Sequence, residues 1–476
     1  MSIQLFDTSG KPMRMNRRNF LRVGAMGGAA LLAACAPPGG AAPAAPAAPA
    51  NNAAAAPTNA PEAVADATGG TKINVLNENW GDIYNKLMEE IGTDFSKANP
   101  GLSVDWNFDP EIFTKLTTLV AANTPPDATT MRPGPLANLA KKGALLDLEG
   151  YIKQAGVTRE DFLTPIYDSG VFEGKQYAVP GGADFICMYY SKDVYKAAGL
   201  DPEKPALTAD DLLGHSKQIL QKEGDDIKRI GYIPSAGQFI NWAYIFGGKF
   251  YDAGSGKIKA NDPANVAALD YLSQFVKLYD VNKLAAFNSR PGLYEAGNAF
   301  SAKQSAYVMD GFWTYEALDQ HSPDIDYGVS WWPTLKDSDE DRKRYAISGW
   351  MFSLPKGGKN TDAAWKFLQY AFIEKSARMG YLTLNGPCIK KAAKEWEEGL
   401  VKKMGAKNRM APHLHKFTDT GALASNFFPI IPVQSFYSDE INRVFDLVMR
   451  GQATPQAGLD EVTKNVQAEL DKAMKA

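Results

Sequence analysis

The chain has 476 residues, of which 45% are hydrophobic and 11% aromatic. At roughly 100–200 residues per domain, this length allows two or three domains with sizeable cores. The 51 basic and 54 acidic residues nearly balance, and no block of lysines and arginines appears in the globular part, so nucleic-acid binding is not expected.

The N-terminus has the features of a bacterial export signal. Arg17-Arg18 precede an apolar stretch over residues 23–34, which is shorter than the roughly 20 residues that a membrane-spanning helix needs. The stretch ends in Leu32-Ala33-Ala34-Cys35, which resembles a bacterial lipobox, and the paired arginines resemble a twin-arginine signal. We therefore expect residues 1–35 to direct export and Cys35 to be acylated. Acylation would anchor the protein to the outer face of the cytoplasmic membrane.

Residues 36–70 are dominated by Pro, Ala, Gly and Asn and contain almost no large apolar side chain. Such a segment has little apolar surface to bury, so we expect it to stay extended and mobile. Its predicted role is a tether between the membrane lipid and the folded body.

From residue 71 the pattern alternates between strand and helix. Residues 73–76 form a short apolar strand, and a helical stripe follows over residues 83–95. Alternation over residues 102–108 predicts a second strand, residues 112–119 a second helix, and residues 127–131 a third strand. This order predicts βαβ units with a parallel sheet, whose ligands bind beyond the carboxyl ends of the strands.

Two large side chains lie in the loops at those strand ends. Trp80 follows the first strand and Arg132 follows the third, and a tight turn requires neither. Both are candidate ligand contacts, and packing against the surface of the lobe explains them equally well.

Three places further along the chain are candidate crossings between two lobes. They are Gly181-Gly182 between two extended segments, residues 329–332 followed by Pro333, and Asn385-Gly386-Pro387. The predicted N-terminal lobe comprises residues 71–182 and 333–390, and the predicted C-terminal lobe comprises residues 183–332 and 391–476. The chain should end in two helices, separated at Gly451 and resumed at Pro455 with Thr454 as the cap.

The body resembles the family 1 extracellular solute-binding proteins, a group that includes maltose- and glycerol-phosphate-binding proteins. The resemblance rests on an ordered series of short motifs from residue 71 to the C-terminus. The most specific motif begins with Gly-Lys-Gln-Tyr-Ala-Val-Pro at residues 174–180 and continues to Tyr190-Ser191-Lys192-Asp193. The resemblance implies a two-lobed α/β fold of the periplasmic-binding-protein type II. It also implies a monomer that closes on its ligand by hinge motion and delivers it to the membrane subunits of an ABC importer.

The resemblance to this family also suggests candidate ligand contacts, because sugars need flat aromatic surfaces and fixed hydrogen-bonding groups. Trp313 matches the position where the family stacks a sugar ring, and Asp184 lies where sugar-binding relatives often have a carboxylate, although it could equally cap a turn. Trp242 and Trp350 are predicted wall residues. The weaker candidates are Gln238, Asn241, Asp310 and Tyr437.

Catalysis, metal binding and cofactor binding are not expected. The four histidines do not have the helical spacing of a zinc motif, and no nucleophile elbow or phosphate-binding loop appears. Cys187 and Cys388 could form a disulfide in an exported protein, and two buried thiols are the interpretation that we favour, because the sequence does not give their separation in space. Three alternatives remain open. Arg132 could bind a phosphodiester, acidic and aromatic side chains could bind a cationic amine, and paired carboxylates could belong to an exported glycosidase.

Overall fold

The computed structural model describes residues 70–475. The predicted export signal, the acylation site Cys35 and all of the tether except residue 70 lie outside the described residues. No helix within residues 70–475 is both long enough and apolar enough to span a membrane.

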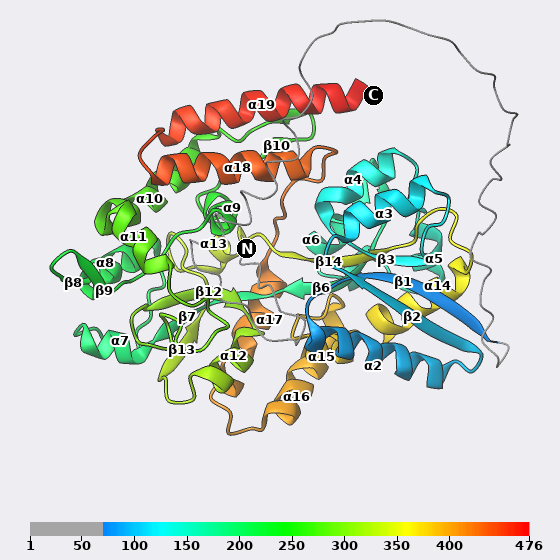
Figure 1. Ribbon diagram of the computed structural model, residues 1–476, viewed down its shortest axis with the longest axis horizontal. Helices are drawn as coiled ribbons and strands as arrows, with labels where there is room; N and C mark the ends of the chain where they lie inside the picture. Colours follow the sequence, from blue (N-terminus) through cyan, green and yellow to red (C-terminus); the bar gives the residue numbers. More distant parts are fainter. Residues whose placement is uncertain (1–69, 476) are drawn as a thin grey trace, which may run out of the picture. The chain divides into compact units, whose positions relative to one another are not determined.

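The N-terminal lobe is built on a five-stranded sheet (Figure 1). Its strands, in spatial order, are β2 (Leu102–Asp109), β1 (Thr71–Glu78), β3 (Ala128–Met131), β14 (Ser348–Ser353) and β6 (Val179–Asp184). Both β2 and β3 pair with β1 in parallel, which confirms the predicted βαβ order. The strand β14 is antiparallel to both of its neighbours because it enters the sheet from the other lobe.

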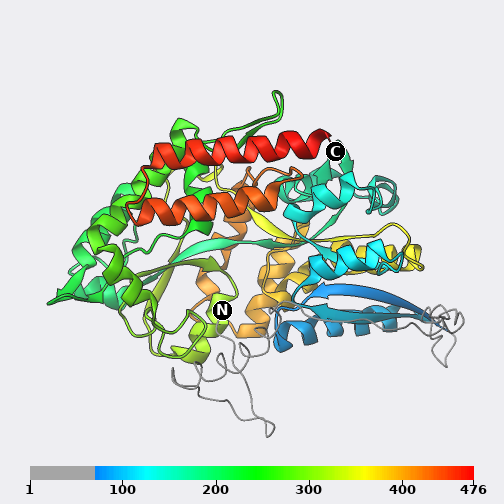
Figure 2. The ribbon, with the colours of Figure 1, turned by 45° about the horizontal axis from the view of Figure 1, so that its top comes forward.

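Helices cover both faces of this sheet, with α3 and α4 on one side and α2 and α15 on the other (Figures 1 and 2). In α2 (Asp82–Ala98), Ile91 and Phe95 of the predicted stripe are fully buried. The remaining helices and the small hairpin of this lobe are α3 (Ile112–Ala121), α4 (Pro133–Lys141), α5 (Glu149–Gln154), α6 (Thr164–Asp168), α14 (Thr361–Gln369), α15 (Ser376–Thr383), and β4 (Val171–Phe172) with β5 (Lys175–Gln176).

The C-terminal lobe has a three-stranded antiparallel sheet surrounded by helices. Its strands, in spatial order, are β12 (Tyr307–Gly311), β7 (Ile186–Ser191) and β13 (Tyr327–Ser330). Two small hairpins extend from it, β8 (Gln221–Glu223) with β9 (Asp226–Arg229), and β10 (Tyr251–Asp252) with β11 (Lys257–Ile258). Its helices are α7 (Lys192–Ala197), α8 (Ala209–Ile219), α9 (Ala236–Ile245), α10 (Pro263–Tyr279), α11 (Val281–Asn288), α12 (Thr314–His321), α13 (Asp339–Arg342), α16 (Ala393–Met404), α17 (Leu414–Leu423), α18 (Gln434–Met449) and α19 (Pro455–Lys475).

The two C-terminal helices form as predicted and lie side by side (Figures 1 and 2). Gly451 has a φ of 69° after the end of α18, a conformation that favours glycine. Thr454 accepts a hydrogen bond at Oγ1 from the backbone N–H of Ala457 at 3.2 Å, and α19 begins at Pro455.

The first crossing between the sheets lies at Phe185, not at Gly181-Gly182. Both glycines belong to β6 of the N-terminal sheet, and β7 of the C-terminal sheet begins at Ile186. The two glycines instead leave room for the Trp350 indole, because a Cβ at either position would lie within 2.6 Å of it. Phe185 is buried at the crossing.

The second crossing also comes later than predicted. After β13 the chain stays with the C-terminal lobe, where Trp332 packs on Trp242 with ring centroids 5.9 Å apart. The backbone N–H of Ala346 still donates to Asn241 of that lobe at 3.0 Å, and the chain joins the N-terminal sheet at Ser348. The predicted change at Pro333 is therefore about fifteen residues too early, because a proline marks a turn but not the sheet that follows it. In the third candidate, Gly386 pairs with Ala183 beside the first crossing.

Candidate ligand-binding cleft

A cavity of about 550 Å³ lies between the two lobes, at the carboxyl ends of β1 and β3. This volume is within the range of small-molecule sites, roughly 300–1,000 Å³. Side chains from both lobes line it: Trp80, Tyr84, Arg132, Asp184, Tyr294, Trp313, Glu316, Ala317, Gln320, His321, Trp350, Thr383 and Asn385.

Two tryptophans form the wall on the N-terminal lobe. The ring centroids of Trp80 and Trp350 lie 5.1 Å apart with the planes tilted by 55°. Trp350 is only 2% exposed, and its indole lies against the backbone of β6 where Gly181-Gly182 leave room for it. Its Nε1 donates to Oδ1 of Asn385 at 3.2 Å, so the orientation of this indole is fixed.

Asp184 presents a carboxylate beside these rings. Its oxygens accept hydrogen bonds from Oγ of Ser348 at 2.9 Å and from Nδ2 of Asn385 at 3.0 Å. Burial raises the pKa of the Asp184 carboxyl, while Arg132 and Ser348 oppose this shift. Each carboxylate oxygen keeps a free lone pair, so Asp184 can still accept a hydrogen bond from a ligand hydroxyl.

Arg132 is held by a carboxylate of its own lobe. Its Nε and Nη2 both lie 3.1 Å from Oε2 of Glu78, at the end of β1. The pairing partly neutralises the guanidinium, while the remaining N–H groups can donate to an uncharged or an anionic ligand.

The opposite wall comes from the C-terminal lobe. Trp313 lies between the end of β12 and α12, and its Nε1 donates to the Tyr294 hydroxyl at 2.9 Å. Glu316 forms an ion pair with Lys403 at 3.0 Å. Tyr84 of the N-terminal lobe lines the same cavity, and its burial together with the Glu316 carboxylate raises the pKa of Tyr84 to about 12. At this edge the cleft is therefore lined from both lobes.

Comparison with known proteins supplies the family. A model described as bacterial extracellular solute-binding protein matches residues 77–377, which is more than half of the chain. The chain belongs to this family. Membership makes it an extracellular binding protein and not an enzyme.

Individual relatives of the solute-binding protein are distant in sequence. The chain is 25% identical to the maltodextrin-binding protein MdxE of Bacillus subtilis, over 65% of the chain and 72% of that protein. It is 24% identical to the diacetylchitobiose-binding protein DasA of Streptomyces coelicolor, over 87% of the chain and 92% of that protein. The structure of CpMnBP1 with mannotriose bound has a TM-score of 0.69 at 22% identity, and the match covers 84% of this chain and all of that one. The fold is thus that of the periplasmic-binding proteins, as the sequence predicts.

The structure brings five of the predicted site residues together in the cleft. They are Trp80, Arg132, Asp184, Trp313 and Trp350. A sixth, Asp310, lies behind the wall, where its carboxylate accepts hydrogen bonds from Tyr294 and from the backbone of Gly311.

The other four predicted residues lie elsewhere in the C-terminal lobe. Trp242 and Tyr437 are fully buried, so the prediction that they contact ligand is corrected. Trp242 donates from Nε1 to the Tyr232 hydroxyl at 3.0 Å, and Tyr437 donates to a backbone carbonyl. Gln238 accepts a hydrogen bond from the Tyr232 hydroxyl, and Asn241 accepts one from the backbone N–H of Ala346 in the crossing segment. Gln238, Asn241 and Trp242 lie on α9, and Tyr437 lies on α18. Both helices pack their aromatic side chains into the core of the lobe, and a local sequence pattern does not reveal this packing.

Several cleft residues were not predicted from the sequence. Tyr84 lies in the first turn of α2, but Trp80 precedes the helix, so helical spacing does not connect the two side chains. Asn385 lies in a segment whose sequence indicates only a crossing. Tyr294 and His321 had no detectable signal, because neither belongs to a strand end in the predicted sheet.

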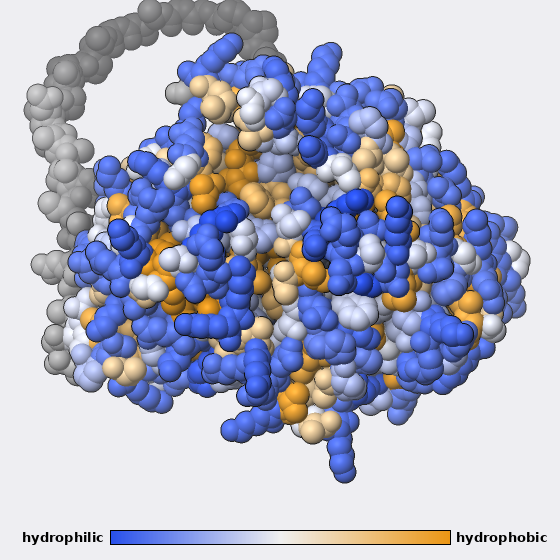
Figure 3. All heavy atoms as spheres, turned by 180° about the vertical axis from the view of Figure 1, so that it is seen from behind, coloured by the Kyte–Doolittle hydropathy of each residue, from blue (hydrophilic) through white to orange (hydrophobic). Residues whose placement is uncertain are grey.

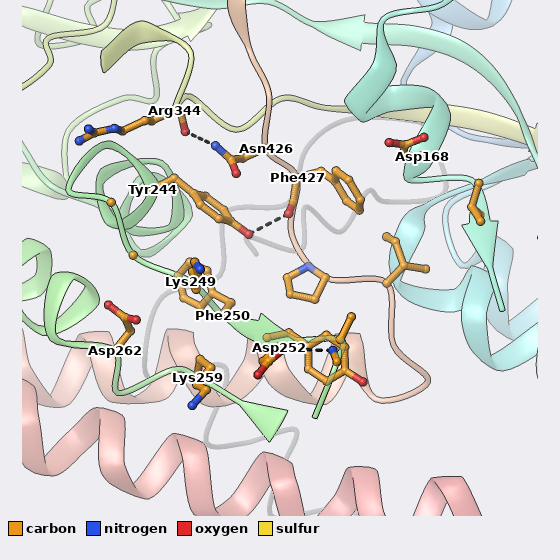
Figure 4. A pocket seen from close by; sticks show the side chains of 18 residues that line it. Asp168, Tyr244, Lys249, Phe250, Asp252, Lys259, Asp262, Arg344, Asn426 and Phe427 are labelled. Carbon is orange, nitrogen blue, oxygen red and sulfur yellow. Dashed lines mark hydrogen bonds between the residues drawn. The ribbon is translucent and has the colours of Figure 1, made fainter. Parts of the chain in front are cut away.

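A larger groove of about 1160 Å³ shares no lining residue with the cleft (Figure 4). It lies between α9, β10 and α6. Lys249, Lys259, Asp252 and Asp262 lie along it on exposed or half-exposed segments, and no tryptophan lines it. The smaller cleft therefore has the chemistry expected of a sugar site.

The described residues hold no cluster of metal ligands and no disulfide. Within residues 70–475 no three His, Cys, Asp or Glu side chains are placed to hold a metal ion. Cys187 and Cys388 are buried free thiols, in agreement with the prediction, and burial raises the pKa of both. The face seen in Figure 3 is mainly hydrophilic, with hydrophobic side chains in small separate patches and in a hollow.

Proposed function

We propose that this solute-binding protein is the ligand-capturing component of an ABC importer and binds an oligosaccharide between its lobes. The observation that supports this proposal is the pairing of aromatic rings with hydrogen-bonding groups in one cleft. Trp80 on one wall and Trp313 on the other offer flat surfaces to the C–H faces of sugar rings, and the buried Trp350 packs against Trp80. Asp184 and Arg132 offer an acceptor and a donor to hydroxyl groups. The similar proteins described above are named for binding maltodextrin and diacetylchitobiose or were solved with mannotriose, and these sugars belong to the same class of ligand.

A cationic amine is the second candidate ligand. Among the described residues no lysine or arginine forms an ion pair with Asp184, and three tryptophans line the same cleft. A carboxylate surrounded by aromatic rings also suits an ammonium group. Arg132 disfavours this candidate, because it places a positive charge in the same cavity.

Calorimetric titration separates the two candidates. The probes are mannotriose, maltotriose and diacetylchitobiose, with spermidine and glycerophosphocholine as the amine and phosphodiester alternatives. We expect one of the sugars to bind and Trp313→Ala to weaken that binding by at least tenfold, because truncating a central tryptophan typically costs about 2 kcal/mol or more. Binding of spermidine or glycerophosphocholine alone would contradict an oligosaccharide function.

We further propose that Cys35 is acylated after export through a twin-arginine signal and that the protein stays on the outer face of the cytoplasmic membrane. The N-terminal motifs support this location, and one relative is named as a solute-binding lipoprotein. In membrane fractions, Cys35→Ser should release the protein, whereas replacing Arg17-Arg18 by lysines should block export. Retention of the Cys35→Ser protein on the membrane would contradict the anchor.

A further inference from the structure

Tyr294 occupies an unusual position in the cleft. It lies in the irregular stretch between α11 and β12, and its side chain is 51% exposed although it is large and aromatic. It lines the cavity beside Trp313. Its ring therefore lies at the edge of the ligand cavity, within reach of a bound ligand.

The hydroxyl of Tyr294 is the middle of a directed hydrogen-bond chain. Nε1 of Trp313 donates to this hydroxyl at 2.9 Å, and the hydroxyl donates to Oδ2 of Asp310. The backbone N–H of Gly311 donates to the other oxygen of Asp310 at 2.7 Å. An indole N–H can only donate and a carboxylate can only accept, so the direction of the chain is fixed.

The same chain determines how Trp313 lies in the cleft. The indole lies across the backbone of Gly311, where a Cβ would overlap the six-membered ring. The ring therefore rests on β12 on one side, and the hydrogen bond to Tyr294 holds its nitrogen edge. Together these contacts present the opposite face of the indole to the cavity.

We propose that Tyr294 is a ligand-binding residue that orients Trp313, and that its hydroxyl accepts a hydrogen bond from a hydroxyl group of the sugar. Asp310 is the positioning residue of this unit, because it accepts a hydrogen bond from the Tyr294 hydroxyl and does not line the cavity itself. This inference rests on the proposed oligosaccharide function.

The hydrogen-bonding groups of Tyr294 and Asp184 imply which ligands the cleft selects. The Tyr294 hydroxyl donates its one hydrogen bond to Asp310 and accepts one from Trp313, so its second lone pair can only accept. Asp184 on the opposite wall is likewise an acceptor. The cleft thus selects a ligand with O–H donors at both ends, and an O-methylated or fluorinated sugar at either end binds more weakly.

The test uses Tyr294→Phe, which keeps the ring and removes the hydroxyl. In the ligand-free protein, the indole N–H signal of Trp313 is one of nine and is assigned by its loss in Trp313→Phe. We expect Tyr294→Phe to shift this signal and to weaken binding of mannotriose, maltotriose or diacetylchitobiose about tenfold to a hundredfold, because the sugar hydroxyl loses its acceptor and the indole N–H of Trp313 loses its partner. Asp310→Asn should shift the same signal while leaving the tyrosine ring in place.

The matched control is Tyr251→Phe in the larger groove, which should change neither the indole signal nor sugar binding. An unchanged Trp313 signal together with unchanged affinity in Tyr294→Phe would overturn the inference, even if Trp313→Ala abolishes binding. If no sugar binds the wild-type protein, the proposed function and the hydroxyl contact fail together. The indole signal then still decides whether Tyr294 orients Trp313.

Discussion

Gly182→Ala tests whether the glycine pair in β6 provides flexibility or space. Neither Gly181 nor Gly182 has a positive φ, so the backbone accepts alanine at both positions. A Cβ at Gly182, however, would lie 2.6 Å from the indole of Trp350. The expected effect is therefore steric and depends on Trp350.

The size of the effect follows from how tightly Trp350 is held. Its indole is 2% exposed and lies 5.1 Å from the ring of Trp80 and 5.6 Å from that of Phe372, centroid to centroid. It cannot move away without losing its hydrogen bond to Asn385. Overpacking of this kind costs about 1–3 kcal/mol in the free energy of unfolding.

Urea unfolding of the single and double variants measures this cost. We expect Gly182→Ala to lower the free energy of unfolding by about 1–3 kcal/mol in the wild-type background and by much less in a Trp350→Leu background, which lacks the indole. Gly214→Ala is the control, because Gly214 lies exposed in α8 and a Cβ there would have no neighbouring heavy atom within 4 Å. Alanine there should stabilise the helix by about 0.5–1 kcal/mol. An equal cost of Gly182→Ala in both backgrounds would refute the steric explanation and restore the flexible-hinge interpretation.

Two further predictions concern titrating groups. Burial and the nearby Lys416 and Lys192 lower the pKa of His413 from 6.5 to about 4, so the stability that depends on neutral His413 is complete above pH 6.5 and is lost as the pH falls towards 4. His413→Gln should flatten the free energy of unfolding over this range, and parallel curves for both proteins would contradict the assignment. Cys187 and Cys388 should not react with a thiol reagent in the native protein, because both are buried and the pKa of Cys187 is raised to about 12. Unfolding without reductant should release both thiols, and their absence would indicate a disulfide.

Part of the fold could be predicted from the sequence because it depends on local patterns. The stripe that ends at Phe95 forms α2, and the alternation after Gly101 forms β2. Both periodicities arise within one element, so a single sequence is sufficient. The crossing points could not be predicted in this way. A glycine pair is equally compatible with a hinge and with space for an indole that comes from a strand about 170 residues further along the chain.

The candidate site likewise contains residues that could be predicted from the sequence and residues that could not. Trp80 and Arg132 follow strands of a βαβ series, and the carboxyl ends of such strands meet at one edge of a sheet, so their place in the cleft follows from the sequence. Trp242 looks equally suitable in the sequence, yet it is fully buried. Only the packing of α9 against the rest of its lobe distinguishes a buried tryptophan from one in the cleft.

The order of the elements, the family and the kinds of side chain available to a ligand could be inferred from the amino-acid sequence. The places where the chain passes between the sheets, the aromatic rings that face the cleft, and the link from Asp310 through Tyr294 to Trp313 emerge only in the folded protein. This division arises because periodicity and capping act over a few residues. Burial and hydrogen-bond direction in the cleft depend instead on segments that meet only after the chain has folded.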